Sequence, residues 1–160
     1  MYKTKIDIPE NSRTKLVELL NNRLAESIDL MLTAKQAHWN VKGPHFIALH
    51  ELFDKVVDEA ADYGDLLAER AIQLGGYAEG TTHVVAKRSG MKEYPLNIAD
   101  GMSHVDYLST ALAHFGKQVR SAIDLSTELK DAGTADIFTE ISRSVDKYLW
   151  FVEAHLQSAK

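Results

Sequence analysis

The sequence predicts a single-domain, all-α protein built as a four-helix bundle. Apolar residues recur at spacings of three and four along four long segments, which is the period of helices that bury one face. Only 3 prolines and 9 glycines, the residues that interrupt helices, occur in 160 residues. A hydrophobic fraction of 45% and a charged fraction of 26% are ordinary for a globular chain with a sizeable core.

The first two helices are expected on either side of a Gly43-Pro44 turn. One runs from residue 11 or 12 to His38, leaving residues 1–10 as a short tail before the domain at 11–160. The other ends at Gly75-Gly76, because glycine is a common helix stop. The apolar stripes, which we expect in the core, are Leu16, Leu20, Leu24, Ile28 and Met31, then Phe46, Leu49, Phe53, Val56, Ala60, Tyr63, Leu67 and Leu74.

The third helix is expected from about Asp100 to Leu129, and the fourth begins near Thr134, a suitable N-cap with Asp136 behind it. Their stripes are Val105, Leu108, Leu112, Phe115, Val119 and Ala122, then Ile137, Ile141, Val145, Tyr148 and Val152. About 24 residues separate the second helix from the third, too many for a hairpin loop. A long crossover here, with a short helix at 82–87, gives the ferritin-like arrangement of a four-helix bundle.

Composition excludes several classes of protein. The net charge of −5 argues against a basic body that coats nucleic acid. With no cysteine, the chain has no disulfide, thiolate metal site or cysteine nucleophile. No apolar run approaches about 18 residues, so we expect no membrane span. The first residues lack the apolar core of a signal peptide, so the expected location is the cytoplasm.

The second predicted helix carries the main functional signal, in His50, Asp54, Asp65 and Glu69. These residues form two pairs spaced i,i+4, and at about 100° per residue all four fall within an arc of about 100°. His50 and Asp65 are nevertheless about 22 Å apart along the axis, at about 1.5 Å per residue. One chain therefore cannot bring both pairs to one metal ion.

Two antiparallel copies of this helix can join the pairs. A two-fold axis near position 59 or 60 places His50 opposite Glu69 of the second copy, and it places Asp54 opposite Asp65. The aspartates at 58 and 62 share this face, and packing two acidic faces together without a cation is costly. Imidazole combined with carboxylates suits iron or zinc. The pattern predicts half of a metal site, repeated twice across a symmetric dimer.

His38, at the end of the first helix, is a further candidate ligand, with a purely structural histidine as the alternative. Di-iron sites inside one ferritin-type bundle use Glu-x-x-His pairs, a spacing that occurs nowhere in this chain. An iron site is therefore expected between subunits. Of the remaining histidines, only His83 in the crossover is a candidate for an accessory metal site.

Six segments carry a resemblance to a known family: AHWNVKG at 37–43, FIALHELFD at 46–54, DLLAERAIQLGG at 65–76, YPL at 94–96, TADIF at 134–138 and KYLWFVEAH at 147–155. From about residue 16 to residue 155 the chain resembles the Dps proteins (DNA protection during starvation), the small ferritins. The resemblance implies a ferritin-like subunit in a hollow dodecamer, with ferroxidase centres at the two-fold interfaces. The implied ligands of the two iron ions, which zinc could replace, are His38, His50 and Asp54 of one subunit with Asp65 and Glu69 of its mate.

The implied activity is oxidation of Fe(II), with hydrogen peroxide preferred over dioxygen, followed by storage of ferric mineral inside the shell. This activity would protect the cell and its DNA from oxidative damage. Trp39, beside His38, is a candidate electron donor to stray oxidising species, with plain packing as the alternative. The resemblance also implies acidic pores at the three-fold axes, for which the candidates are Asp136, Glu140 and Asp146.

DNA binding and compaction is the alternative function. Dps proteins that bind DNA often carry a mobile lysine-rich tail, and the candidates here are Lys3, Lys5, Arg13 and Lys15. Twelve copies would multiply a weak, salt-sensitive contact through avidity. The acidic body opposes such binding. A third interpretation is an all-α oligomer whose acidic helix faces are only solvated or paired.

Overall fold

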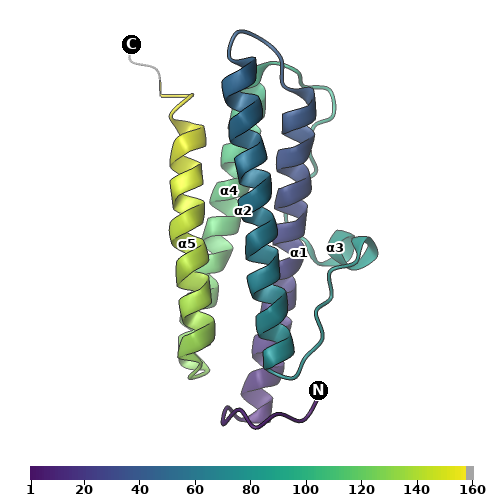
Figure 1. Ribbon diagram of the computed structural model, residues 1–160, viewed down its shortest axis with the longest axis vertical. Helices are drawn as coiled ribbons and strands as arrows, with labels where there is room; N and C mark the ends of the chain where they lie inside the picture. Colours follow the sequence, from purple (N-terminus) through teal and green to yellow (C-terminus); the bar gives the residue numbers. More distant parts are fainter. Residues whose placement is uncertain (158–160) are drawn as a thin grey trace.

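The computed structural model describes residues 1–157, which contain five helices and no strand (Figure 1). α1 (Glu10–Asn40), α2 (Phe46–Gln73), α4 (Gly101–Glu128) and α5 (Ala132–Glu153) form the bundle, and α3 (Thr82–Arg88) lies in the crossover. The predicted ferritin-like four-helix bundle with a short crossover helix is confirmed. None of the helices in the described residues combines the length and apolar character that a membrane span needs.

The crossover from α2 to α4 returns along the side of the bundle formed by α1 (Figure 1). Side chains of α1 hold it there. The amide of Asn21 donates to the backbone carbonyl of Tyr77 and accepts from the backbone N–H of Glu79. Arg88 at the end of α3 forms ion pairs of 2.7 Å with Glu18 and with Glu79. This path keeps the acidic face of α2 free of crossover residues.

Most of the predicted core positions are buried, including every predicted position of α4. Phe46 is an exception. We expected it in the core, but it is 40% exposed because it is the first residue of α2, at the end of the bundle. Ile28, Met31 and Ile137 are only partly buried and pack against the edge of the core.

The start of α5 also differs from expectation. Asp131, not Thr134, is the N-cap: its Oδ1 accepts the backbone N–H of Thr134 at 3.0 Å. The same oxygen lies 2.8 Å from the Arg70 guanidinium, which reaches across from α2. Burial acts to raise the pKa of Asp131, but the hydrogen bonds from Thr134 and Arg70 outweigh it and hold that pKa below its usual value. Asp131 therefore joins the ends of α2 and α5.

The residues before α1 lie against the end of the bundle rather than away from it. The backbone N–H of Tyr2 donates to the carbonyl of Gly75. Gly75 has φ +87, and a Cβ there would come within 2.6 Å of the Tyr2 carbonyl oxygen. Arg13 donates to the carbonyls of Ile8 and Leu74, at 3.0 and 2.9 Å. These contacts fix the N-terminal segment to the end of the bundle at which α2 terminates.

We expect Asp131→Ala to lower the free energy of unfolding by about 3 kcal/mol. The substitution removes a helix cap of about 1 kcal/mol and a charge-assisted hydrogen bond of about 2 kcal/mol. Urea denaturation at one fixed protein concentration measures this, because oligomer stability depends on concentration. The control is Asp124→Ala, an exposed position on α4.

The lowered pKa of Asp131 predicts how its contribution to stability changes with pH. Since the folded-state pKa of Asp131 is lowered, its contribution is present above about pH 4 and is lost as pH falls through the folded-state value. The difference between wild type and Asp131→Ala should therefore shrink in acid. A difference that is the same at pH 7 and pH 2 would contradict this account.

Candidate metal centre

His38 and His50 come together where α1 ends and α2 begins. Their rings stack, with centroids 3.7 Å apart and planes 21° from parallel. Nδ1 of His38 lies 2.8 Å from the backbone carbonyl oxygen of His50, and Nδ1 of His50 lies 2.9 Å from that of His38. A carbonyl only accepts, so each Nδ1 carries the hydrogen. Each Nε2 therefore keeps a lone pair for a metal ion.

The helix end explains why this arrangement forms. The last carbonyls of a helix have no partner in the next turn, and that of His38 belongs to this group. The backbone N–H of Lys42, four residues on, donates instead to Ala99. The His50 ring supplies the missing donor. The contact thus satisfies a half-buried carbonyl and orients an imidazole at the same time.

Asp54 lies one turn beyond His50 and faces the same pair. Its Oδ1 is 3.7 Å from Nδ1 of His38 and 2.5 Å from Nζ of Lys35, with which it forms an ion pair. The Lys35 hydrogen bond, with the nearby histidines, holds the pKa of Asp54 below its usual value. The carboxyl is therefore ionised at neutral pH, and its side chain is 45% exposed, open to a cation.

Lys35 was not among the predicted site residues, although it forms an ion pair with Asp54. The signal was available, because Lys35 precedes His38 by three residues and so shares its face of α1. Lys35 balances the charge of Asp54 and would compete with a cation for that oxygen.

Asp65 and Glu69 stand apart from this cluster. Both are exposed on α2, nearer its C-terminal end. Within residues 1–157, no three histidine, aspartate or glutamate side chains of one chain are placed to hold a metal ion. The structure thus brings His38, His50 and Asp54 near one another but does not complete a ligand set in a single subunit.

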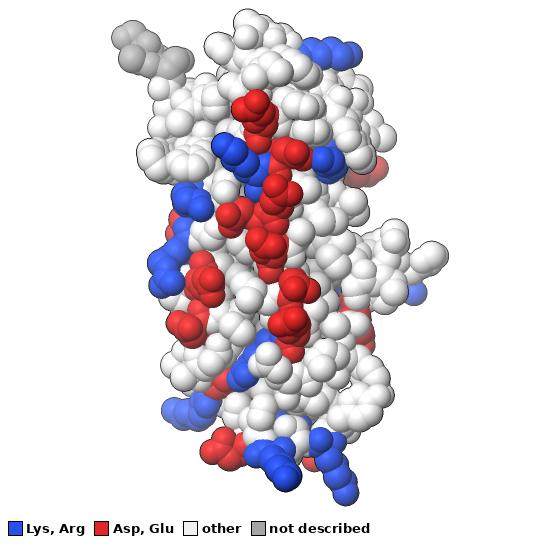
Figure 2. All heavy atoms as spheres, in the orientation of Figure 1, with Lys and Arg blue, Asp and Glu red and all other residues white. Residues whose placement is uncertain are grey.

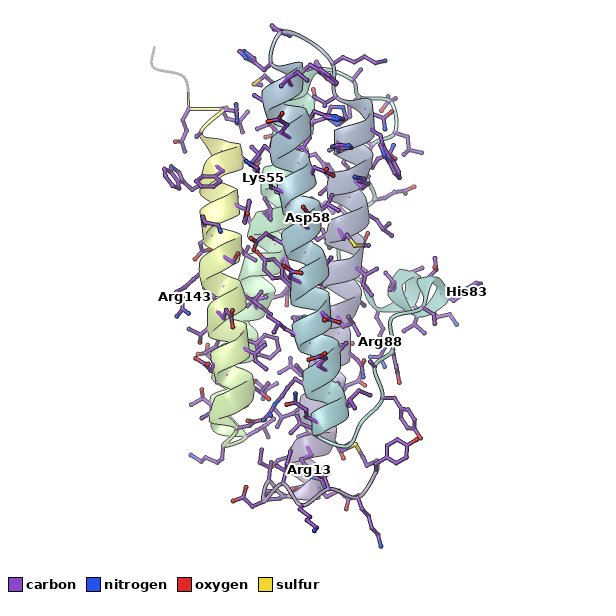
Figure 3. All side chains as sticks on the ribbon, viewed as in Figure 1. Arg13, Lys55, Asp58, His83, Arg88 and Arg143 are labelled. Atoms are coloured by element: carbon purple, nitrogen blue, oxygen red, sulfur yellow. The ribbon has the colours of Figure 1, made fainter. Side chains whose placement is uncertain are left out.

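An acidic face runs down α2. Figure 2 shows its carboxylates as a column on the front of the molecule, and Asp58 lies near its middle (Figure 3). The column contains Glu51, Asp54, Asp58, Asp62, Asp65 and Glu69. Ile47 and Ile72, which are 60% and 53% exposed, flank the column at its two ends. A single subunit leaves this face, with its two apolar ends, open to solvent.

The other predicted site residues occupy scattered surface positions. Trp39 is 66% exposed beside His38. Asp136 and Glu140 are exposed one turn apart on α5, whereas Asp146 forms an ion pair of 2.8 Å with Arg120. His83 points away from the bundle on α3 (Figure 3).

The basic residues proposed to contact DNA divide into two groups. Lys3, Lys5 and Lys15 are exposed. Arg13 is 8% exposed and its guanidinium donates to backbone carbonyls, so it is a weaker candidate for a DNA contact than the three lysines. The sequence showed its charge, but only the fold shows that the charge serves to anchor the N-terminal segment.

Comparison with known proteins agrees with this architecture. Residues 17–160 match the ferritin-like domain family. Among solved structures, a tetragonal form of Dps from Mycobacterium smegmatis superposes with a TM-score of 0.94 at 31% identity, covering 99% of this chain and 96% of that one. The fold and the family match together define a ferritin-like protein.

Relatives in sequence show which family of ferritin-like proteins the chain belongs to. The DNA protection during starvation protein of Agrobacterium fabrum is 47% identical over 156 residues, which is 98% of this chain and 96% of the relative. A Dps protein from Vibrio cholerae O1, described as a member of a broad superfamily of ferritin-like diiron-carboxylate proteins, has a TM-score of 0.90 at 27% identity, covering 98% of each chain. The chain belongs to the Dps family, as its sequence segments predicted.

We expect Lys35→Met to tighten binding of Zn(II) or Co(II) about fivefold at pH 7. The lysine competes for Asp54, and a charge at about 4 Å in a water-like medium is worth about 1 kcal/mol. Calorimetric titration of the metal into the assembled protein measures the change. The control is Lys15→Met, an exposed lysine at the opposite end of α1. Equal affinities for wild type and Lys35→Met would contradict the competition.

Proposed function

We propose that this protein is a ferroxidase and iron-storage protein. It oxidises Fe(II), with hydrogen peroxide as the preferred oxidant, at di-iron centres shared between two subunits. The ferric product is stored as mineral inside a hollow shell of twelve subunits. The observation that carries the proposal is the His38–His50 pair, whose two Nε2 atoms are free and lie beside the ionised Asp54.

A second subunit supplies the rest of the centre. A two-fold axis near position 59 or 60 sets Asp65 and Glu69 of one α2 against Asp54 and His50 of the other. Ile47 and Ile72 support the same axis. Ile47 and Ile72 are equally far from this axis in sequence. Ile47 of one subunit therefore meets Ile72 of the other, and both exposed side chains lose their contact with water. Apolar contacts at both ends and iron in between offset the cost of joining two acidic faces.

The ligand set suits the chemistry. Two Fe(II) ions each give one electron to hydrogen peroxide, whose O–O bond breaks without release of hydroxyl radical. The imidazoles of His38 and His50 bind as neutral donors, and the carboxylates of Asp54, Asp65 and Glu69 offset the charge that iron gains on oxidation. Glu69 bridges the metal positions or anchors the more tightly held iron. A small ligand set leaves coordination positions open for the oxidant.

The remaining candidate residues serve the entry of Fe(II) into the shell and protection from escaping oxidants. Asp136 and Glu140 line the acidic pores through which Fe(II) reaches the interior. Asp146 contributes less, since Arg120 already neutralises it. Trp39, exposed beside the centre, gives an electron to oxidants that escape the paired iron ions. Zinc, which accepts the same ligands, occupies the centre without redox chemistry.

DNA binding has less support as the primary function. The segment that carries Lys3 and Lys5 is anchored through Arg13 and Tyr2, so it does not extend as a free arm. The net charge of the chain is −5. Protection of DNA therefore follows mainly from removal of Fe(II) and peroxide.

We expect His50→Ala and Asp54→Ala each to slow peroxide-driven oxidation of Fe(II) by about tenfold or more, within the range for loss of a metal-site interaction. Fe(II) is added anaerobically, peroxide follows, and ferric absorbance in the near ultraviolet is recorded with the iron left in solution. The expected stoichiometry for wild type is two irons per peroxide. His45→Ala, an exposed histidine just before α2, is the control. Wild-type rates in both ligand variants would refute the centre.

A mixed assembly tests whether two subunits share each centre. His50→Ala and Glu69→Ala remove ligands from opposite halves. In a mixed dimer one centre carries both defects and the other carries none. Random co-assembly of equal amounts should therefore restore about one quarter of the wild-type centres. If the centre lay within one chain, the mixed shells would stay as slow as the two parents.

A further inference from the structure

A hydrogen-bonded cluster joins α2 and α5 around Glu59, away from the proposed metal ligands. The phenol of Tyr148 donates to Oε1 of Glu59 at 3.0 Å. The hydroxyl of Ser144 donates to Oε2 at 2.6 Å, and the phenol of Tyr63 donates to Ser144 at 2.8 Å. Both tyrosines are buried, with 8% and 4% exposure. The carboxylate thus accepts directly from two hydroxyl groups, and a third is linked to it through Ser144.

Burial and nearby charges keep Tyr148 as a neutral phenol and Glu59 as a carboxylate. Burial acts to raise the pKa of Glu59, but the bonds from Ser144 and Tyr148 and the ammonium of Lys147, 3.8 Å away, outweigh it and lower that pKa. Burial, with the hydrogen bond to Glu59 and its negative charge, raises the pKa of Tyr148 to about 12. Lys147 also lies 4.4 Å from the centroid of the Tyr148 ring. At neutral pH the proton therefore stays on the phenol.

The cluster is also well placed along α2. Glu59 lies midway between the His50/Asp54 pair and the Asp65/Glu69 pair, which is the level of the two-fold axis in the proposed function. At about 1.5 Å per residue, both pairs are about 11 Å away along the helix. The ring centroids of Tyr148 and Phe151 are 5.7 Å apart, and those of Phe151 and Trp150 are 4.9 Å apart. Trp150 is 62% exposed. Aromatic contacts therefore connect Tyr148 to the surface.

We propose that Tyr148 is a one-electron donor and that Glu59 accepts its phenolic proton. The oxidant is a hydroxyl radical or another one-electron oxidant, formed where a single Fe(II) meets peroxide. The oxidant takes one electron from Tyr148, and a hydroxyl radical becomes hydroxide. The phenolic O–H bond breaks and the proton moves to Oε1 of Glu59. The products are a neutral phenoxyl radical and a carboxylic acid.

Return to the resting state needs one further electron. A second Fe(II) supplies it and becomes Fe(III), while Glu59 returns the proton to the phenolate oxygen. The net result is that a damaging radical is reduced at the expense of iron that the protein is built to oxidise. Moving the proton together with the electron avoids the charged phenol cation, which burial would disfavour.

Other tyrosines have different partners: the hydroxyl of Tyr94 pairs with Nδ1 of His104, and that of Tyr63 donates to Ser144, whereas Tyr148 donates directly to a carboxylate. Tyr107 donates its hydroxyl to the backbone carbonyl of Lys92, and a carbonyl is too weak a base to take the proton. This difference makes Tyr107→Phe a matched control, since it removes a half-buried phenol without touching a carboxylate. A purely structural cluster would make Tyr148→Phe and Tyr107→Phe behave alike in redox experiments.

The test uses iron-free assembled protein, so it does not depend on the proposed ferroxidase centre. Azide radicals from pulse radiolysis oxidise the protein by one electron, and the near-ultraviolet absorbance of the tyrosyl radical is followed in time. In wild type we expect the tyrosyl signal to grow as the tryptophan radical decays, more slowly in D2O than in H2O. Tyr148→Phe should abolish most of this growth, whereas Tyr107→Phe should leave it unchanged.

Glu59→Gln tests the proton acceptor. The amide keeps the size of the side chain but is a far weaker base, so growth of the signal should slow on the order of 100-fold, the typical worth of a positioned base. Circular dichroism and sedimentation check that each variant is folded and assembled. Wild-type growth in Tyr148→Phe, a wild-type rate in Glu59→Gln, or no isotope effect in the wild-type protein would each overturn the proposal.

Discussion

The fixed rise of α2 is the constraint on which the rest of this structure depends. A continuous helix of 28 residues holds the His50/Asp54 pair and the Asp65/Glu69 pair at set positions on one face. Core residues such as Phe53, Val56 and Leu67 bury the opposite face along the whole length, so the helix cannot bend to bring the pairs together. The proposed ligand set therefore needs a second copy, which would couple iron chemistry to assembly.

The start of α2 shows how one contact can serve folding and function together. The reciprocal hydrogen bonds of His38 and His50 satisfy backbone carbonyls, fix both ring tautomers and tie the end of α1 to α2. Lys35 pairs with Asp54 and balances its charge. In the proposed centre, these contacts would hold three of the ligands in place and so lower the cost of ordering them around iron.

The two sides of α2 divide the work. One side carries the acidic face and the proposed iron ligands, and a second side, next to the core face, carries Glu59 against α5. In the two proposals made above, this division would separate two-electron chemistry at paired iron ions from one-electron chemistry at a phenol. At the far end of the helix, Arg70 and Asp131 fasten α2 to α5, and Arg13 fastens the N-terminal segment to the chain just beyond α2. The long helix is thus held at several points, as a shared interface requires.

By itself, the sequence determined what depends on local geometry. Helical periodicity predicted the four long helices and most of the core, and helical rise set the separation of the two pairs on α2, because hydrogen bonds between neighbouring turns set both quantities. Only the tertiary structure decided which distant side chains meet. The capping of α5 by Asp131, the exposure of Phe46, the pairing of Lys35 with Asp54 and the burial of Arg13 all follow from how helix ends and turns pack. Whether two side chains on different helices meet depends on how closely the helices approach and on the path of the turns between them. The spacing of residues along one helix determines neither.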